Sequence, residues 1–151
     1  MATIKRITTQ DTYALRQRIL RPHQSLDHCQ YPGDLDSTTV HYGVINAQAI
    51  VGILSLYRVN HEEIDIPQSW QLRAMATCES ARGKGYGIKL IEKAESYIKS
   101  GYTHCILGQC IWANARTSAL GFYQKLGYLS VGPEFDIPAV GPHYLCYKKL
   151  P

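Results

Sequence analysis

The sequence lacks several features that would point to other classes of protein. It has no apolar run approaching the ~18 residues of a membrane-spanning helix, and it has no internal repeat or low-complexity tract. Its five cysteines include no Cys-x-x-Cys pair, and the opening MATIKRITTQD has no apolar run typical of a signal peptide. We therefore expect a reduced, cytoplasmic protein without a membrane partner.

Size and charge narrow the choice further. At 151 residues and 45% hydrophobic composition, the chain can bury one sizeable core, so we expect a single domain over residues 1–151. The formal net charge of +4 suits an anionic ligand, but the Lys and Arg residues are scattered, and we predict no nucleic-acid partner. The six histidines show no pair at metal-ligand spacing on a helix, so we predict no metal.

Hydrophobic periodicity predicts an α+β chain. Alternation and β-branched content indicate strands over residues 3–7, 39–45, 49–57, 70–77, 103–112, 128–131 and 143–150. Helical spacing indicates helices over residues 10–20, 87–99 and 115–126. Thr8 or Thr9 is expected to cap the first helix and Asn114 the third, which Gly127 ends. The order predicts a mixed, mostly antiparallel sheet with helices on both faces.

Three polar segments have no sustained periodicity and are predicted as loops: residues 22–38, which have room for one short helix, 58–69 and 132–142. The helix over 87–99 has a clearer pattern. Its inward stripe is predicted to consist of Leu90, Ile91, Ala94, Tyr97 and Ile98, with the charged residues, Glu95 among them, mostly on the opposite face.

The stretch RGKGYG, residues 82–87, connects a predicted strand to a predicted helix. Such a turn presents successive backbone N–H groups at a helix N-terminus, where the macrodipole adds partial positive charge. Arg82 and Lys84 add full charges, and glycines let oxygen atoms approach the main chain. The turn is therefore either a phosphate site or an ordinary tight connection.

Spacing excludes two common glycine motifs. A dinucleotide fingerprint that starts at Gly83 needs glycine at Ile88, and a nucleotide-triphosphate loop needs Ser or Thr where Gly85 stands. The pattern Arg-x-x-Gly-x-Gly at Arg82, Gly85 and Gly87 instead resembles the acyl-coenzyme A pyrophosphate loop of the GNAT family of N-acetyltransferases. A second segment, NARTSALGFYQKLGY, resembles that family's other recurrent helix, so the resemblance covers nearly the whole chain.

The resemblance implies a single-domain acyl-CoA N-acyltransferase fold that transfers an acetyl group from acetyl-CoA to a small-molecule or peptide amine. It implies direct attack of the amine on the thioester in a ternary complex, with Tyr123 as the acid that protonates the leaving thiolate. The cofactor-binding positions that it implies are Met75, Ala76, Thr77, Arg82, Gly83, Lys84, Gly85, Tyr86, Gly87, Asn114 and Arg116. Arg116 occupies the position where members often carry Asn, and it is expected to approach a phosphate or the acceptor.

The sequence leaves the general base open among Glu79, His143 and a water chain, with Glu134 and Asp136 in the preceding loop as further carboxylates. A nucleophilic role for Cys78 is discounted, because no His that could pair with it lies nearby in sequence. Two other functions stay open: a non-catalytic acyl-CoA binder or sensor, and a basic RNA-associated module. The chain is expected to be a monomer or a homodimer.

Overall fold

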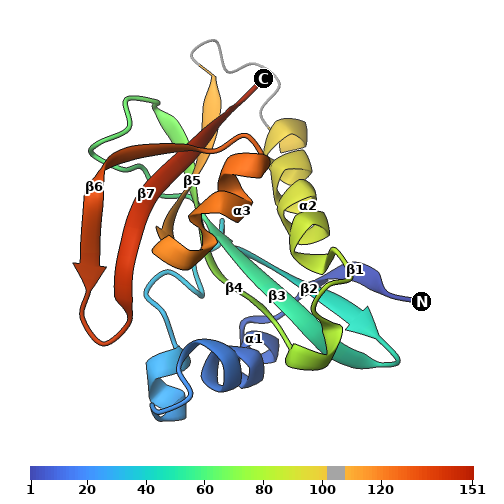
Figure 1. Cartoon of the computed structure of the whole chain (residues 1–151). Coiled ribbons are helices and arrows are strands. Elements are labelled where there is room, and N and C mark those ends of the chain that lie inside the picture. Colours follow the sequence, from blue (N-terminus) through green and yellow to red (C-terminus); the bar gives the residue numbers. More distant parts are fainter. Residues whose placement is uncertain (102–107) are drawn as a thin grey trace. The chain divides into compact units, whose positions relative to one another are not determined.

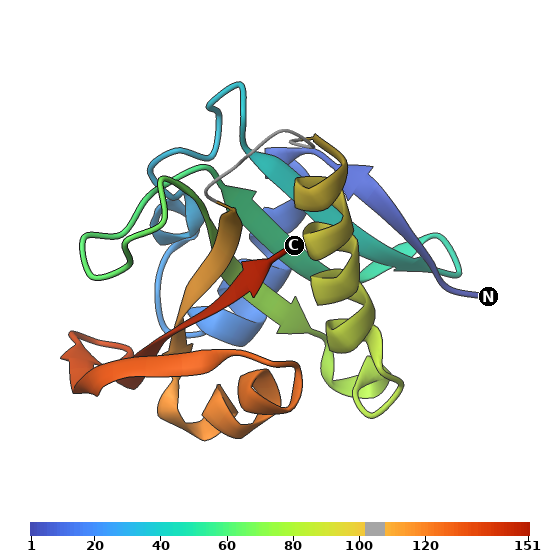
Figure 2. The same cartoon turned by 90° about the horizontal axis from the view of Figure 1, so that it is seen from above.

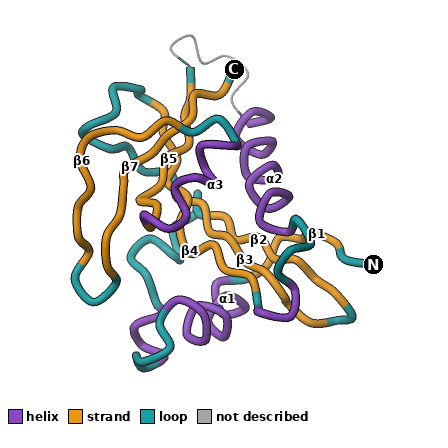
Figure 3. Tube along the Cα trace, viewed as in Figure 1, coloured by secondary structure: helices purple, strands orange, loops and turns teal. Residues whose placement is uncertain are grey.

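The computed structural model describes residues 1–101 and 108–151 (Figure 1). Its strands are β1 (Thr3–Ile7), β2 (Val40–Asn46), β3 (Ala49–Tyr57), β4 (Gln68–Thr77), β5 (Gln109–Arg116), β6 (Leu129–Ile137) and β7 (Gly141–Leu150). Its α-helices are α1 (Thr9–Leu15), α2 (Tyr86–Gly101) and α3 (Leu120–Lys125). The short helical turns are η1 (Arg16–Leu20), η2 (Leu26–Cys29), η3 (Glu79–Ala81) and η4 (Thr117–Ala119), and Figure 3 distinguishes helices, strands and loops by colour.

The chain divides into two compact units, which are described separately. The first unit consists of Met1–Tyr57 and Leu72–Tyr97, and the second of Arg58–Gln71 and Ile98–Pro151. Strand β4 passes from the second unit into the first after Gln71. The expectation of one domain over residues 1–151 stays a prediction.

Strands β1, β2 and β3 of the first unit form an antiparallel meander. β2 and β3 are joined by a tight turn in which Ala47 and Gln48 have φ of 50° and 66°. Two central residues with positive φ give a turn whose twist matches that of the flanking strands. The strands predicted over residues 39–45 and 49–57 are therefore confirmed, and they form an antiparallel hairpin.

Helices α1 and α2 cover opposite faces of this sheet (Figure 2). Successive side chains of a strand point to opposite faces. Ile53 of β3 shares a buried cluster with Leu15 of α1, whereas a Cβ on the preceding Gly52 would lie 3.5 Å from Leu90 of α2. The prediction of helices on both faces is confirmed for this unit.

The predicted caps and stripes agree with the structure in part. Thr8 caps α1 through a reciprocal hydrogen-bond pair with Asp11. In α2 the predicted inward residues are buried, except for half-buried Tyr97. The prediction for Glu95 was wrong: its side chain is 7% exposed, because it falls beside Ala94 and Ile98 at the edge of the apolar stripe.

The second unit contains the remaining strand pairs. β4 and β5 run parallel from Gln68 opposite Gln109 to Gln71 opposite Trp112. β5 pairs antiparallel with β7, and β7 with β6, while α3 packs against all three of these strands. The predicted mixed, mostly antiparallel α+β architecture is therefore confirmed.

Three boundaries in the second unit differ from the predictions. Asn114 does not cap a helix, because β5 continues through it and pairs it with Leu145 of β7, while Ala119 takes the N-cap position of α3. The predicted loop 132–142 is mostly strand: β6 bulges between Val131 and Phe135 and then resumes its pairing with β7. The predicted strand over 103–112 is found from Gln109 onward, and residues 103–107 lie outside the described residues.

The described residues contain neither a candidate membrane span nor a candidate metal cluster. None of the helices found there is both long enough and apolar enough to cross a membrane. Within residues 1–101 and 108–151, no group of three or more His, Cys, Asp or Glu side chains is placed to hold a metal ion.

Candidate active site

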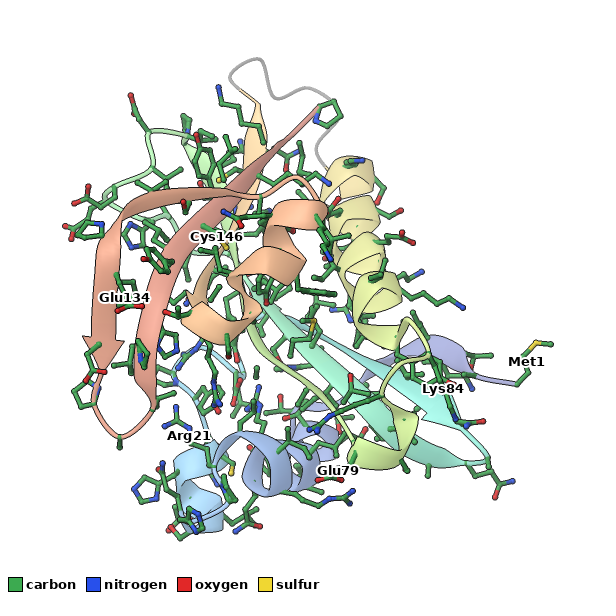
Figure 4. All side chains as sticks on the ribbon, in the orientation of Figure 1. Met1, Arg21, Glu79, Lys84, Glu134 and Cys146 are labelled. Atoms are coloured by element: carbon green, nitrogen blue, oxygen red, sulfur yellow. The ribbon has the colours of Figure 1, made fainter. Side chains whose placement is uncertain are left out.

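The glycine turn lies in the first unit, between the end of β4 and the start of α2. The Cys78 amide donates to the Val51 carbonyl at 2.9 Å, which fixes the end of β4 against β3. η3 follows, and the Gly85 carbonyl then accepts a hydrogen bond from the Lys89 amide at 3.2 Å. Figure 4 shows Lys84 at the start of α2 and Glu79 on the segment that precedes the turn. Helix α2 therefore begins at the turn, as predicted.

The backbone of the turn requires glycine at two positions. Gly83 and Gly85 have φ of 78° and 77°, in the left-handed region that L side chains rarely adopt. A Cβ built on either residue would have no heavy atom within 4 Å. Arg82 and Lys84 are exposed beside them. The need for glycine at these positions therefore comes from the backbone conformation and not from neighbouring atoms. Open space lies in front of this stretch of main chain, which two cations flank.

The strand that leads to the turn has an irregular backbone. Ala74 has φ of 55°, an uncommon conformation for a non-glycine residue within a strand. Met75 and Thr77 are half-buried, whereas Ala76 is buried in the cluster that also contains Leu15 and Tyr86. The first unit thus brings together the predicted strand residues and the predicted turn.

A buried ion pair lies in the same unit. Arg16 is fully buried, and its guanidinium donates to both carboxylate oxygens of Asp34 at 2.7 and 3.0 Å. The same two terminal nitrogens donate to the Cys29 carbonyl, the Ser55 hydroxyl and the Tyr57 hydroxyl. Arg16 Nε is buried and has no hydrogen-bond partner among the described residues.

Asp34 anchors the irregular segment that follows η1. Its carboxylate accepts hydrogen bonds from the Tyr31 amide at 2.8 Å and the Tyr57 hydroxyl at 2.5 Å. Burial alone would raise the pKa of Asp34, but the hydrogen bonds from Arg16 and Tyr57 outweigh it and hold this pKa below its ordinary value. The His41 ring bridges the Asp34 carbonyl and Ser55, and burial lowers the pKa of His41.

Three guanidinium groups surround the ring of Tyr31. The distances from the guanidinium carbon to the ring centroid are 4.3 Å for Arg16, 4.4 Å for Arg73 and 5.7 Å for Arg21. The sequence analysis singled out none of these residues. Arg16 lies at helical spacing from Thr12 and Ile19. A cation on the apolar face of the first helix is the sequence pattern that could have indicated a buried Arg16.

Tyr123 lies in the second unit and is 6% exposed. Its ring packs edge-on against Phe122 and Tyr128, with centroids 5.5 and 5.4 Å away. Burial, with a smaller contribution from Cys146, raises the pKa of Tyr123, so the phenol is neutral at physiological pH. As a neutral phenol, its hydroxyl can donate a hydrogen bond.

The two remaining predicted cofactor residues also belong to the second unit. Asn114 and Arg116 are exposed on β5, opposite Leu145 and His143 of β7. They lie two residues apart on a strand, so their side chains point to the same face. The predicted set therefore falls into two groups, one in each unit.

The candidate bases have structural partners. Glu79 forms an exposed ion pair with Arg18 at 2.8 Å, and that hydrogen bond lowers the pKa of Glu79. His143 is 4% exposed, and its Nδ1 lies 2.7 Å from the Gly141 carbonyl oxygen. Glu134 accepts a hydrogen bond from the Thr117 hydroxyl. These contacts give Glu79, His143 and Glu134 a structural role each, and none of the contacts singles out one residue as the general base.

Comparisons with known proteins identify the family of this chain. A model of the acetyltransferase (GNAT) domain matches residues 38–129. YitI of Bacillus subtilis, an uncharacterised N-acetyltransferase, is 38% identical over 99% of this chain and 97% of its own length.

Solved structures share the fold. Escherichia coli ElaA has a TM-score of 0.75 at 14% identity, covering 98% of this chain and 99% of that chain. Arabidopsis thaliana NAA60 in complex with acetyl-CoA has a TM-score of 0.75 at 13% identity, covering 99% and 98%. Since the domain model spans more than half of the sequence and YitI aligns over almost all of it, the chain belongs to the GNAT family of acetyltransferases.

Proposed function

We propose that the protein transfers an acetyl group from acetyl-CoA to a primary amine by direct attack in a ternary complex. The observation that carries this proposal is the glycine turn. Gly83 and Gly85 adopt positive φ with open space before them, next to two exposed cations at the start of α2. This combination suits a pyrophosphate, whose oxygens need close access to backbone N–H groups.

The other parts of the cofactor site follow from family membership. Backbone groups near Met75 and Thr77 are proposed to bind the pantetheine arm, and an N–H there to polarise the thioester carbonyl. Arg82, Gly83, Lys84, Gly85, Tyr86 and Gly87 are proposed to hold the pyrophosphate. Asn114 and Arg116 are proposed as further contacts of the cofactor or the acceptor.

The reaction makes few chemical demands on the protein. The acceptor nitrogen bonds to the acyl carbon as the carbon–sulfur bond breaks, so the nitrogen loses one proton and the sulfur gains one. Tyr123 is proposed to donate the proton that the sulfur gains, because burial keeps its phenol protonated. A water chain, Glu79 or His143 is proposed to accept the proton that the nitrogen loses.

Three further properties belong to this proposal: the location, the acceptor and the oligomeric state. The four described cysteines, Cys29, Cys78, Cys110 and Cys146, are free thiols, which supports a reducing, cytoplasmic location. The acceptor is proposed to be a small molecule or a peptide, and the protein a monomer or homodimer. Among the similar structures, an aminoglycoside 6'-N-acetyltransferase in complex with coenzyme A has a TM-score of 0.72 at 13% identity.

The test combines thiol release with cofactor binding. Wild-type protein should release coenzyme A from acetyl-CoA faster when a panel of primary amines is added. Gly85→Asp should abolish acetyl-CoA binding in a calorimetric titration, because it places a side chain and a negative charge in the open space. Gly101→Asp is the matched control, since that glycine also has open space before it but lies at the far end of α2.

The possible results separate the functions. Thiol release with an amine, lost in Gly85→Asp and kept in Gly101→Asp, supports the transferase. Tight acetyl-CoA binding without release on any amine favours the non-catalytic binder. Unchanged affinity in Gly85→Asp rejects the phosphate-binding role of the turn, and binding that needs RNA and ignores coenzyme A favours the RNA-associated module.

A further inference from the structure

The cations around Tyr31 differ in how they are neutralised. Arg16 is paired in bidentate fashion with Asp34. Arg73 and Arg21 have no carboxylate partner among residues 1–101 and 108–151. One ring is thus surrounded by three guanidinium groups and one carboxylate, which leaves two positive charges without a counterion.

Arg73 is the more constrained of the two. It is half-buried on β4, and its guanidinium lies over the Tyr31 ring. A cation–π contact stabilises the charge but gives the guanidinium N–H groups no oxygen acceptor. A planar fork with free N–H groups matches a carboxylate or a phosphate, which can accept two parallel hydrogen bonds.

Arg21 follows η1 and is labelled in Figure 4. Its guanidinium carbon lies 5.7 Å from the centroid of the same ring. It is also half-buried. Because Asp34 holds the Tyr31 amide at 2.8 Å, the ring that both cations contact is fixed by a buried network rather than by a free loop. Preorganised donors bind an anion with a smaller loss of conformational entropy than flexible ones.

Arg73 belongs to the same strand, β4, as the residues proposed to hold the cofactor arm. Arg73 precedes Met75, a proposed pantetheine contact, by two residues of β4, which is at most about 7 Å of extended strand. Tyr31 and Arg21 belong to or adjoin the irregular segment 22–38. The base of the Arg73 side chain therefore lies within about 7 Å of the backbone proposed to hold the cofactor arm.

We propose that Arg73 and Arg21 form an anion-binding subsite over Tyr31 that takes a carboxylate or phosphate group of the acceptor. The acceptor is then a short amine that carries an anionic group, such as an amino acid or an amino-alkyl phosphate. This inference rests on the proposed function, because it names the substrate class of the same site.

The first test measures acceptor preference with matched pairs of amines. The pairs are glycine with glycinamide, β-alanine with β-alaninamide, and phosphoethanolamine with ethanolamine. The ratio of kcat/KM for the anionic member to that for the neutral member should fall at least about tenfold in Arg73→Gln, the loss expected for a charge-assisted hydrogen bond. Comparing variant with wild type cancels the different basicities of the amines.

Arg6→Gln is the control. Arg6 also lies over a tyrosine ring, that of Tyr97, at 5.8 Å, but on β1. It should leave the ratio unchanged, and Arg73→Lys should restore part of it. The carboxylate and phosphate pairs distinguish which anion the site prefers. An unchanged ratio in Arg73→Gln, or an equal fall in Arg6→Gln, overturns the proposal.

A second measurement does not depend on catalysis. Calorimetric titration of the full chain with succinate and with inorganic phosphate should show binding that Arg73→Gln loses and Gly85→Asp keeps. Binding lost only in Gly85→Asp assigns the anion to the glycine turn and overturns the subsite, as does no binding in wild type. If no amine supports thiol release, but anion binding is lost in Arg73→Gln and kept in Gly85→Asp, the transferase proposal fails and the anion site stands.

Discussion

The buried pair of Arg16 and Asp34 gives the sharpest prediction about stability. Asp34→Asn keeps the shape of the side chain but removes its charge and replaces one acceptor oxygen by a donor. Arg16 is then left charged and fully buried, facing an amide. The Tyr31 amide or the Tyr57 hydroxyl also loses its acceptor.

The expected magnitude follows from this burial. Removing one partner of a buried ion pair costs about 3–5 kcal/mol, because the other charge remains without compensation. That is a large share of the roughly 5–15 kcal/mol that stabilises a typical domain. At about 2–4 °C per kcal/mol for a chain of this size, the Tm should fall by about 6–20 °C.

The assay is urea unfolding followed by far-UV circular dichroism, with Glu79→Gln as the control. Glu79 forms an ion pair with Arg18 at 2.8 Å, close to the distance of the buried pair, but the two side chains are 57% and 60% exposed. Solvent screens that pair, so its loss should barely change the free energy of unfolding. Our reasoning is refuted if Asp34→Asn destabilises the protein no more than Glu79→Gln does.

Three further predictions concern the site and pH. Tyr123→Phe should lower turnover at least about tenfold with acetyl-CoA affinity unchanged, and wild-type turnover would reject the acid role. Arg82→Ala and Lys84→Ala should each weaken acetyl-CoA binding by about 1.5–3 kcal/mol in titrations, whereas Lys99→Ala at the end of α2 should not. Because the folded pKa of His41 lies below its ordinary value of 6.5, the unfolding free energy should be highest above that pH and decline as pH falls below it, by at most about 1.4 kcal/mol per unit. His41→Gln should remove this slope in urea titrations at two pH values.

Local patterns made the glycine turn and α2 predictable. The turn depends on positive φ at Gly83 and Gly85, and the helix on one apolar stripe, so neighbouring residues carry the information. The same holds for the β2–β3 hairpin, whose strands are separated by two turn residues.

Pairing between distant segments explains what the sequence analysis missed. Asn114 has good capping chemistry, but its backbone pairs with β7, about thirty residues later, and that ladder extends β5 through it. The bulge in β6 likewise depends on its register with β7. The contact between Arg16 and Asp34 joins a helix to a segment without periodicity, and the proximity of Arg73 to Tyr31 depends on both, so neither appears in a local pattern.

The anchoring of the segment after η1 has a consequence for how the surface of this protein can evolve. Buried Asp34 and Tyr31 hold the segment in place, while Leu35, Asp36, Ser37 and Thr38 are exposed. Side-chain changes at these exposed positions meet little structural resistance, because the side-chain hydrogen bonds that anchor the segment belong to Asp34 and Thr39, and the bonds of Asp36 are made by its backbone. Descendants of this sequence can therefore vary the surface of this segment without losing its fold, while drift at the buried anchor is removed by selection for folding.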